Sequence, residues 1–231
     1  KTGYPVVYNR GLREVKYSWV AFIDDDCVAY IDWFEVIKDS IKKYPGVSAI
    51  LGQTDTYYNR NIFSLSTSFL ENLWKRNRIR NKRVVDLEIL DNRNIVYNQR
   101  FLSKNKIAFD ESRVKRYGGS SEDCDLGMQV QAAGGTAIYE SKMLVLHKDP
   151  VNGIYYFKKL VYSTKGHLSY ERKWSEYRET ISKIHTKVQS AKHLLGFLKG
   201  SKINFISKII LIVVIGLTFL VVKLTKLYEK N

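Results

Sequence analysis

The stretch SWVAFIDDDC, Ser18–Cys27, constrains the fold of this chain more than any other. Its apolar half, WVAFI, is short, rich in β-branched and aromatic residues and free of polar ones, which is typical of a strand buried on both faces, as in a parallel sheet. Asp24, Asp25 and Asp26 follow at the carboxyl end of that strand, the edge where open α/β sheets bind ligands. The stretch therefore predicts a ligand site at the edge of an α/β sheet.

Three adjacent carboxylates repel one another, so we expect a cation to offset their charge. Mg²⁺ or Mn²⁺ takes oxygen ligands and commonly bridges a carboxylate to substrate phosphates. A simpler alternative is that Asp26 caps a following helix while its two neighbours are solvated. The stretch alone leaves both alternatives open.

The composition points to an anionic partner. The chain has 231 residues with 45% hydrophobic residues, enough for one core, and a formal net charge of +15. Nucleic acid, an anionic membrane surface and a phosphorylated substrate would all fit that charge. The basic run WKRNRIRNKR lacks the interleaved aromatic residues of a stacking platform, so we expect no nucleic acid. Cys27 and Cys124 make no disulfide framework and no zinc spacing, which fits a reducing, cytosolic setting.

Alternating strand and helix patterns follow the first strand. Helical spacing of apolar residues predicts helices over residues 30–44 and 62–80. Short apolar runs predict strands over residues 47–51, 84–90, 94–97, 136–140 and 143–147. The order strand, helix, strand over residues 18–51 favours a parallel pair with a right-handed crossover. The sequence thus predicts a mostly parallel sheet flanked by helices.

A second acidic cluster begins a later helix. Its carboxylates are Glu122, Asp123 and Asp125. Ser120 or Ser121 is expected to cap this helix, and Gly134–Gly135 to end it. The helix macrodipole favours ionised carboxylates in the first turn. A capping role without chemistry is the alternative here.

We expect three regions along the chain: a first domain at 1–150, basic amphipathic helices at 151–200, and a membrane segment at 201–231. Two apolar stripes mark the middle region: Ile154, Phe157, Leu160 and Val161, then Ile181, Ile184, Val188, Ala191 and Leu195. The uncharged run Ile209–Val222 is shorter than the ~20 residues that span hydrocarbon. Snorkelling lysines extend it to a credible transmembrane helix over Ile203–Leu227, with an in-plane hairpin or a buried core helix as alternatives. Lysines flank both ends, so charge does not set the orientation.

Four features, in this order, resemble the family 2 glycosyltransferases, which have the GT-A fold. The acids at residues 24–26 resemble the DxD motif of that family. The run DNRNIVYNQRFLSKNKIAFDES at 91–112 resembles its acceptor-side segment, and SEDCDLGMQVQAAGG at 121–135 resembles its ED motif and helix. His147 lies where a late histidine often completes the metal site. The resemblance covers about residues 1–149.

The resemblance implies a role for each of these side chains. Asp26 and His147 would hold Mg²⁺ or Mn²⁺, and Asp24 and Asp25 would face the nucleotide-sugar donor. Asp123, the second acid of the ED pair, would be the general base of an inverting transfer. The residues that would support the site or orient the acceptor are Glu122, Asp125 and Asn94.

Two departures from the family pattern qualify this implication. Members normally begin with strands that form the nucleotide-base pocket, but only 23 residues precede Asp24. We therefore expect either a fragment that lacks these strands or an unusual member of the family. Processive members carry a Gln-x-x-Arg-Trp motif, whereas this chain has Tyr170 and Lys173 in the places of Gln and Arg before Trp174, which favours single-sugar transfer.

The sequence as a whole predicts an inverting, metal-dependent glycosyltransferase at the cytosolic face of a membrane. Its partners would be a nucleotide-sugar donor and a lipid-linked or polysaccharide acceptor. Two rivals remain at this point. A sugar nucleotidyltransferase would use similar acids, and a catalytically inactive membrane-anchored scaffold would explain the missing strands.

Overall fold

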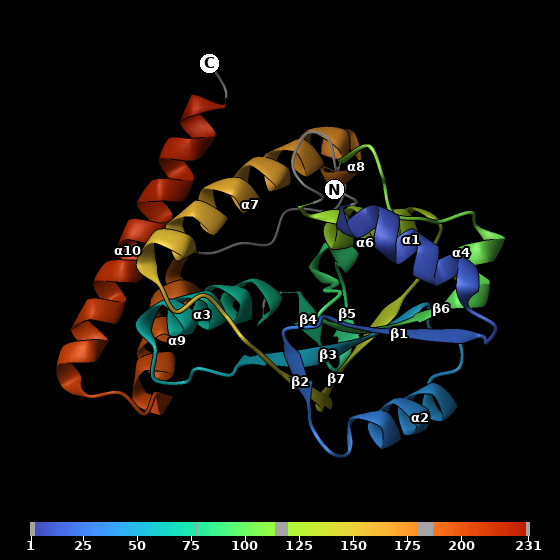
Figure 1. Ribbon diagram of the computed structural model, residues 1–231, viewed down its shortest axis with the longest axis horizontal. Coiled ribbons are helices and arrows are strands. Elements are labelled where there is room, and N and C mark those ends of the chain that lie inside the picture. The colour runs from blue at the N-terminus through green and yellow to red at the C-terminus, as the bar shows by residue number, and fades with distance from the viewer. Residues whose placement is uncertain (1–2, 77, 114–119, 180–186, 230–231) are drawn as a thin grey trace. The chain divides into compact units, whose positions relative to one another are not determined.

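The computed structural model describes residues 3–76, 78–113, 120–179 and 187–229 (Figure 1). The helices are α1 (Tyr4–Glu14), α2 (Trp33–Lys43), α3 (Ile62–Arg76), η1 (Leu87–Ile89), α4 (Gln99–Lys104), α6 (Glu122–Ala132), α7 (Gly153–Lys173), α8 (Ser175–Glu179), α9 (Lys187–Gly200) and α10 (Phe205–Tyr228). The strands are β1 (Trp19–Ile23), β2 (Cys27–Ala29), β3 (Ala49–Thr56), β4 (Ile79–Arg80), β5 (Arg83–Val84), β6 (Asn94–Asn98) and β7 (Ala137–His147). Contacts divide them into unit 1, Lys1–Asp55 with Arg78–His147, and unit 2, Thr56–Asn77 with Lys148–Asn231.

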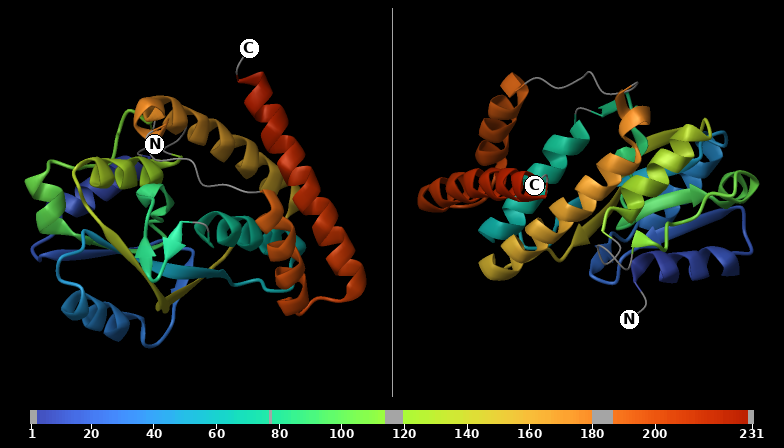
Figure 2. Two further views of the ribbon diagram at one scale, coloured as in Figure 1. Left: turned by 180° about the vertical axis from the view of Figure 1, so that it is seen from behind. Right: turned by 90° about the horizontal axis from the view of Figure 1, so that it is seen from above.

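Unit 1 is a sheet with helices on both faces. The strand order is β1-β6-β3-β7-β5-β4, and β2 pairs with β7 off this path. Helix α2 lies below the sheet, and α1, α4 and α6 lie above it (Figures 1 and 2). Beneath the sheet, buried side chains of α2 and of β3, β6 and β7 form one hydrophobic cluster: Ile37, Ile50, Val96, Ile138 and Met143. The predicted α/β class is therefore confirmed.

The prediction of a mostly parallel sheet is wrong. The pairs β1–β6, β3–β6, β2–β7, β4–β5 and β5–β7 are all antiparallel. Strands β1 and β3 do point the same way, because each runs antiparallel to β6. They are not neighbours, however, since β6 lies between them. The local strand-helix-strand pattern predicted the relative direction of β1 and β3 correctly. It could not reveal that β6, which comes later in the chain, would lie between them.

Strand β1 is also more exposed than its apolar sequence predicts. It stands first in the strand order and pairs with β6 alone among the described strands. The side chain of Ile23 is consequently exposed, and Trp19 is half-buried. The prediction of a strand buried on both faces is wrong for this edge position.

Other boundaries differ more modestly. The two strands predicted at 136–140 and 143–147 form the single strand β7. The strand predicted at 84–90 is the short β5 followed by η1. Strands β4 and β5 are joined by Asn81 and Lys82, both with positive φ, which is the backbone of a tight hairpin turn.

Unit 2 is helical. Its core joins α3, α9 and α10 through buried apolar side chains: Leu65, Phe69, Leu198, Leu211 and Ile215. Helix α3 thus groups with the C-terminal helices, although residues 56–77 lie inside the predicted first domain. Asn152 caps α7 by accepting from the backbone N–H groups of Ile154 and Tyr155. Ile181 and Ile184, predicted in a second amphipathic helix, lie outside the described residues.

Helix α10 contains the predicted membrane segment. It has 24 residues and is long and apolar enough to cross a membrane. Among the described residues it is the one helix with this property, which is weak evidence by itself. Asn204 caps its start by accepting from the N–H of Ser207.

Candidate functional site

The first acidic cluster lies where the sequence predicts it, at the carboxyl end of β1. Residues 24–26 form a turn between β1 and β2, closed by a hydrogen bond from the N–H of Cys27 to the carbonyl oxygen of Asp24 at 3.0 Å. Strand β2 follows the acids directly, and the N-cap position of α2 belongs to Asp32. The alternative in which Asp26 caps a helix is therefore wrong. Asp25 is exposed to solvent.

Asp24 is held by a residue that the sequence analysis did not single out. The hydroxyl of Tyr8, on α1, donates a hydrogen bond to Oδ1 of Asp24 at 2.9 Å. Burial raises the pKa of Asp24, against the lowering effect of this hydrogen bond. Tyr8 itself packs against Phe22 and Phe109. Helix α1 thus fixes the orientation of the first carboxylate of the cluster.

Asp26 and His147 meet, as the resemblance implies. Antiparallel pairing of β2 with β7 sets Cys27 opposite His147, which brings the imidazole beside the preceding aspartate. Oδ2 of Asp26 lies 3.3 Å from Nε2 of His147. The histidine side chain is 4% exposed, whereas that of Asp26 is 47% exposed. The pair therefore joins a buried imidazole to a carboxylate that solvent can reach.

This pair fits a metal that is shared with a substrate. Mg²⁺ and Mn²⁺ favour carboxylate oxygens, and an imidazole nitrogen adds a second donor. In the part of the chain that the structure describes, no group of three or more His, Cys, Asp or Glu side chains could hold a metal ion alone. The remaining ligands would be phosphate oxygens and water, which these ions commonly retain.

The second acidic cluster begins α6, as predicted. Ser121 occupies the N-cap position with a positive φ of 61°, and its side chain makes no capping hydrogen bond. Of the two predicted capping residues, Ser120 and Ser121, the second thus occupies the N-cap position, but its hydroxyl makes no capping bond. Asp123 instead accepts a hydrogen bond from the N–H of Cys124 at 2.8 Å. Gly134, with φ of 76°, follows the end of the helix, as expected for a C-terminal glycine.

Burial governs the charge of this cluster. Desolvation, with the charge of Asp123 next, raises the pKa of Glu122 to about 9. Desolvation, with the charge of Asp91 next, raises the pKa of Asp123 to about 6. A carboxylate whose pKa lies near 6 is ionised at neutral pH and yet basic enough to accept a proton. Glu122 keeps its proton at the same pH.

Arg93 connects the two clusters, and the sequence analysis missed it. Its guanidinium donates two hydrogen bonds of 2.8 Å to the carboxylate of Asp91, and Nη1 lies 3.5 Å from Nδ1 of His147. Its positive charge lowers the pKa of both Asp24 and Asp123. Arg93 therefore contacts Asp91 and His147, and its charge partly offsets the rise in the pKa of Asp24 and of Asp123. The only signal in the sequence was the position of Asp91 and Arg93 directly before a strand.

Two of the predicted support residues have structural partners. The side-chain amide of Asn94 donates to the carbonyl oxygens of Gln53 and Met143, at 2.7 Å each, and accepts from Nε1 of Trp33. A Cβ on Gly52 would lie 2.2 Å from this amide, so the glycine makes room for it. Asp125 is fully buried and accepts a hydrogen bond from Gln129 at 3.0 Å. An acceptor-binding role for either residue stays a prediction.

Close packing fixes the position of α6. A Cβ added to Gly127 would lie 1.9 Å from the carbonyl oxygen of Leu87, so only glycine lets the helix approach η1 this closely. Gln131, one turn later, accepts a hydrogen bond from the N–H of Leu87 at 2.8 Å. These contacts set where Glu122 and Asp123 stand in the unit.

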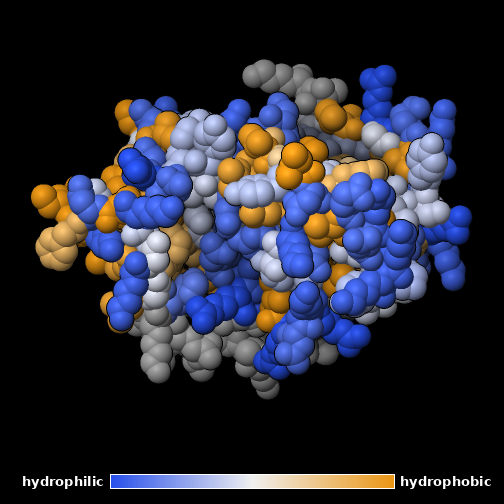
Figure 3. All heavy atoms as spheres, turned by 90° about the horizontal axis from the view of Figure 1, so that it is seen from below, coloured by the Kyte–Doolittle hydropathy of each residue, from blue (hydrophilic) through white to orange (hydrophobic). Residues whose placement is uncertain are grey.

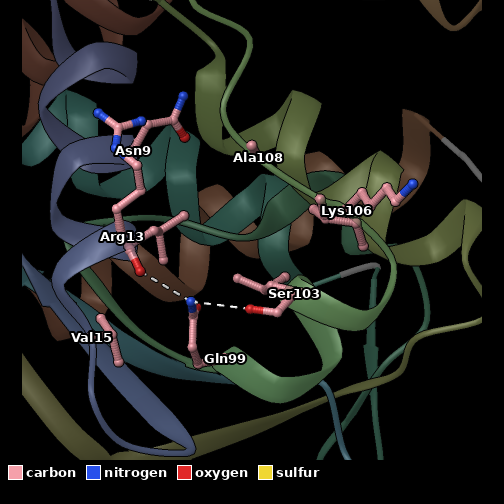
Figure 4. Close-up of a pocket in the computed structure, with 10 residues that line it drawn as sticks. Asn9, Arg13, Val15, Gln99, Ser103, Lys106 and Ala108 are labelled. Atoms are coloured by element: carbon pink, nitrogen blue, oxygen red, sulfur yellow. Dashed lines mark hydrogen bonds between the residues drawn. The ribbon is translucent and has the colours of Figure 1, made fainter.

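A pocket of about 460 Å³ lies elsewhere in unit 1, between α1 and α4 (Figure 4). Arg13, Gln99, Ser103 and Lys106 are among the residues that line it. None of the side chains predicted for the site is among its lining residues, and all of those side chains belong to the described part of the chain. The acidic site is therefore distinct from this pocket.

Comparison with protein-family models finds one match. Residues 1–104 match the model described as glycosyl transferase family 2. This segment includes the cluster at the end of β1 together with Asp91 and Arg93. It stops before the cluster of α6 and before His147. A search among curated proteins finds no match.

Solved structures give weaker likenesses. The crystal structure of S. aureus TarS has 13% identity and a TM-score of 0.47, with 85% of this chain and 31% of that chain covered. TarS 1-349 in complex with UDP-GlcNAc has 12% identity and a TM-score of 0.48, with 85% and 52% covered. TarS 1-349 alone has 14% identity and a TM-score of 0.48, with 87% and 61% covered. This chain spans less than two thirds of the length of each of these structures.

Proposed function

We propose that this chain, whose residues 1–104 match the model of glycosyl transferase family 2, is an inverting glycosyltransferase that uses a nucleotide-sugar donor and a divalent metal. The observation that carries the proposal is the contact between Asp26 and His147, which Arg93 in turn joins to Asp91. Transfer of a sugar needs the departing diphosphate to be stabilised and the acceptor hydroxyl to lose a proton. Each cluster suits one of these tasks.

The cluster of β1 serves the donor. Asp26 and His147 would hold Mg²⁺ or Mn²⁺, and the bound ion would supply positive charge for the departing diphosphate. Asp24, oriented by Tyr8, faces the ribose or the sugar of the donor, and the solvent-exposed Asp25 also faces the donor. The exposure of Asp26 supports this assignment, because the metal site must admit the substrate.

The cluster of α6 serves the acceptor. Asp123 accepts the proton of the acceptor hydroxyl as that oxygen attacks the anomeric carbon. The new glycosidic bond forms on the face opposite the leaving nucleoside diphosphate, which inverts the configuration. The raised pKa of Asp123 suits a base at neutral pH. Glu122 remains protonated there, so it adds no negative charge next to an anionic donor.

The acceptor is a lipid-linked sugar or a polysaccharide at a membrane, and the catalytic part lies on the cytosolic side, where nucleotide sugars are available. The apolar helix α10 supports a place at a membrane. The net charge of +15 supports contact with anionic lipid headgroups and with the diphosphate of a donor.

Calorimetry tests the donor side of this proposal. We would titrate UDP, GDP, ADP, CDP and TDP into the chain with and without Mn²⁺, and repeat the best case with Asp26→Ala. The control is Asp39→Ala, which removes an exposed aspartate of α2. We expect binding that needs Mn²⁺, is lost in the Asp26 variant and is unchanged in the control. Binding that ignores both the metal and Asp26 would contradict the metal assignment, and pyrophosphate exchange on a sugar nucleotide would indicate a nucleotidyltransferase instead.

A further inference from the structure

Helix α10 has two faces with different surroundings. One stripe at a spacing of three to four residues is buried in unit 2: Leu211, Val214, Ile215, Thr218 and Thr225. The opposite face is apolar but exposed along the whole helix: Phe205, Ile206, Ile209, Ile212, Val213, Leu217, Phe219, Leu220, Leu224, Leu227 and Tyr228. Figure 3 shows hydrophobic residues, interspersed with hydrophilic ones, on the side where Figure 1 draws α9 and α10. Exposure of so large an apolar face to water is unfavourable, so we expect a partner to bury it.

Polar contacts fasten the middle of α10 to its neighbours. The hydroxyl of Tyr156, on α7, lies 2.7 Å from Oγ1 of Thr218 and 2.8 Å from Oγ of Ser66. All three side chains are buried, so each hydroxyl finds its hydrogen-bond partner in another hydroxyl instead of in water. Helix α10 is therefore fixed to α3 and α7 at the level of Thr218.

Ion pairs join the C-terminal end of α10 to α7. Oε1 of Glu229 lies 2.8 Å from Nζ of Lys165, and Nζ of Lys226 lies 3.6 Å from Oε2 of Glu171. Helix α7 carries many further ionisable side chains: Lys158, Lys159, His167, Arg172 and Lys173. The stretch of α10 after Thr218 is thus accompanied by a helix that cannot enter hydrocarbon without a large cost.

This arrangement leaves too little of α10 to cross a bilayer. Before Thr218, the helix runs from Phe205 to Leu217, which is about 20 Å at about 1.5 Å per residue. A hydrocarbon core is about 30 Å thick. The buried core residues Leu211 and Ile215 further hold this half of the helix against α3 and α9. A crossing helix would have to leave all of these partners.

We propose that α10 lies in the plane of an anionic membrane, with its exposed face in the interface between headgroups and acyl chains. Exposed lysines before and along the helix complement anionic headgroups: Lys199, Lys202 and Lys223. A long helix with one apolar face and basic residues beside it binds in this way. The inference rests on the membrane attachment in the proposed function, but not on its chemistry.

Depth measurements on vesicles test this orientation. Ile206, Val213, Leu220 and Leu227 are all exposed and lie seven residues apart on one face. Each would be replaced by cysteine in the full chain with Cys27→Ser and Cys124→Ala, and labelled with a fluorophore. Vesicles of phosphatidylcholine and phosphatidylglycerol with shallow or deep nitroxide quenchers then report depth. We expect equal, shallow depth at all four positions.

Other outcomes overturn the inference in distinguishable ways. Deep labels at 213 and 220 with shallow labels at 206 and 227 would show a crossing helix. Absence of vesicle binding would contradict the membrane attachment as well. The proposed chemistry would be tested separately, by nucleotide binding in calorimetry. Val213→Asp should weaken vesicle binding at least tenfold, whereas Val85→Asp, an equally exposed valine of unit 1, should leave binding unchanged. Equal weakening by both variants would also overturn the inference.

Discussion

The two acidic clusters of unit 1 hold the same kinds of side chain in different surroundings. At the end of β1, Asp25 is exposed and Asp26 keeps 47% of its side-chain surface accessible. At the start of α6, desolvation raises the pKa of Glu122 and of Asp123. Exposure suits a ligand that must meet a metal and a diphosphate, and desolvation suits a base that must take up a proton. Their surroundings, rather than their residue types, separate the two roles.

The largest effect should come from removing Asp123, the proposed base. Asp123→Asn should lower sugar transfer by about 10²- to 10⁴-fold, because no carboxylate remains there to accept the proton of the acceptor hydroxyl. Donor binding, measured by calorimetry with Mn²⁺, should remain within a few fold. The control Asp39→Asn makes the same change at an exposed site of α2 and should leave turnover intact. Retained transfer in the Asp123 variant would remove the distinction between the clusters.

The substitution of Arg93 should have the second-largest effect. Arg93→Gln leaves Asp91, which is 5% exposed, without its bidentate partner, so we expect a loss of about 3 kcal/mol in unfolding free energy. Because Arg93 lowers the pKa of Asp123, the rise of kcat/KM with pH should also move to higher pH in this variant. Urea denaturation and a pH–rate profile measure the two effects.

A double variant checks the cause. Arg93→Gln with Asp91→Asn removes the stranded carboxylate, so it should recover much of the lost stability. A double variant as unstable as the single one would mean that Arg93 acts through packing instead of charge.

The position of α6 can be disturbed while the cluster of β1 is left in place. Gly127→Ala puts a Cβ 1.9 Å from the carbonyl oxygen of Leu87, a backbone atom, so we expect a loss of about 1 to 3 kcal/mol in unfolding free energy. Transfer should fall more than Mn²⁺-dependent nucleotide binding. Gly11→Ala, in α1 with nothing within 4 Å, should instead be neutral or stabilise by up to about 1 kcal/mol. Similar losses in both variants would show that α6 has room to move.

The smallest effect concerns the pH dependence of stability. The folded-state pKa of Glu122, about 9, is raised above its unfolded value of 4.5, so its contribution is complete below about pH 4.5 and is lost as pH rises toward 9. Glu122→Gln cannot ionise, so its advantage over the native chain should grow steadily between pH 5 and pH 8. Urea denaturation at pH 5 and pH 8 measures it. The exposed Glu14→Gln should show no such trend, and a constant difference for Glu122→Gln would contradict its raised pKa.

The sequence predicted the elements of unit 1 better than their arrangement. Apolar runs located β1, β6 and the C-terminal half of β7, since strand patterns are local. Pairing is not local, so nothing in residues 18–51 could reveal that β6 would stand between β1 and β3. The exposure of β1 has the same origin, because its sequence is as apolar as that of an inner strand.

The candidate site was predictable where acids cluster in the sequence and was missed where single residues contribute. Runs such as those at 24–26 and 122–125 are conspicuous, and the family resemblance added His147. Tyr8 and Arg93 occur among many other tyrosines and arginines in this basic chain. Only folding brings the phenol to Asp24 and the guanidinium between Asp91 and His147.

The amide of Asn94 has a consequence for how the sheet can assemble. It reaches across Gly52 to carbonyl groups of two different strands, β3 and β7. A slip of β7 by one residue would withdraw the Met143 carbonyl and leave a buried donor unpaired, at a cost of about 1 to 3 kcal/mol. The same slip would set Leu146 or Lys148 opposite Cys27 in place of His147. One asparagine thus selects among alternative strand alignments, and by doing so it decides which side chain stands beside Asp26.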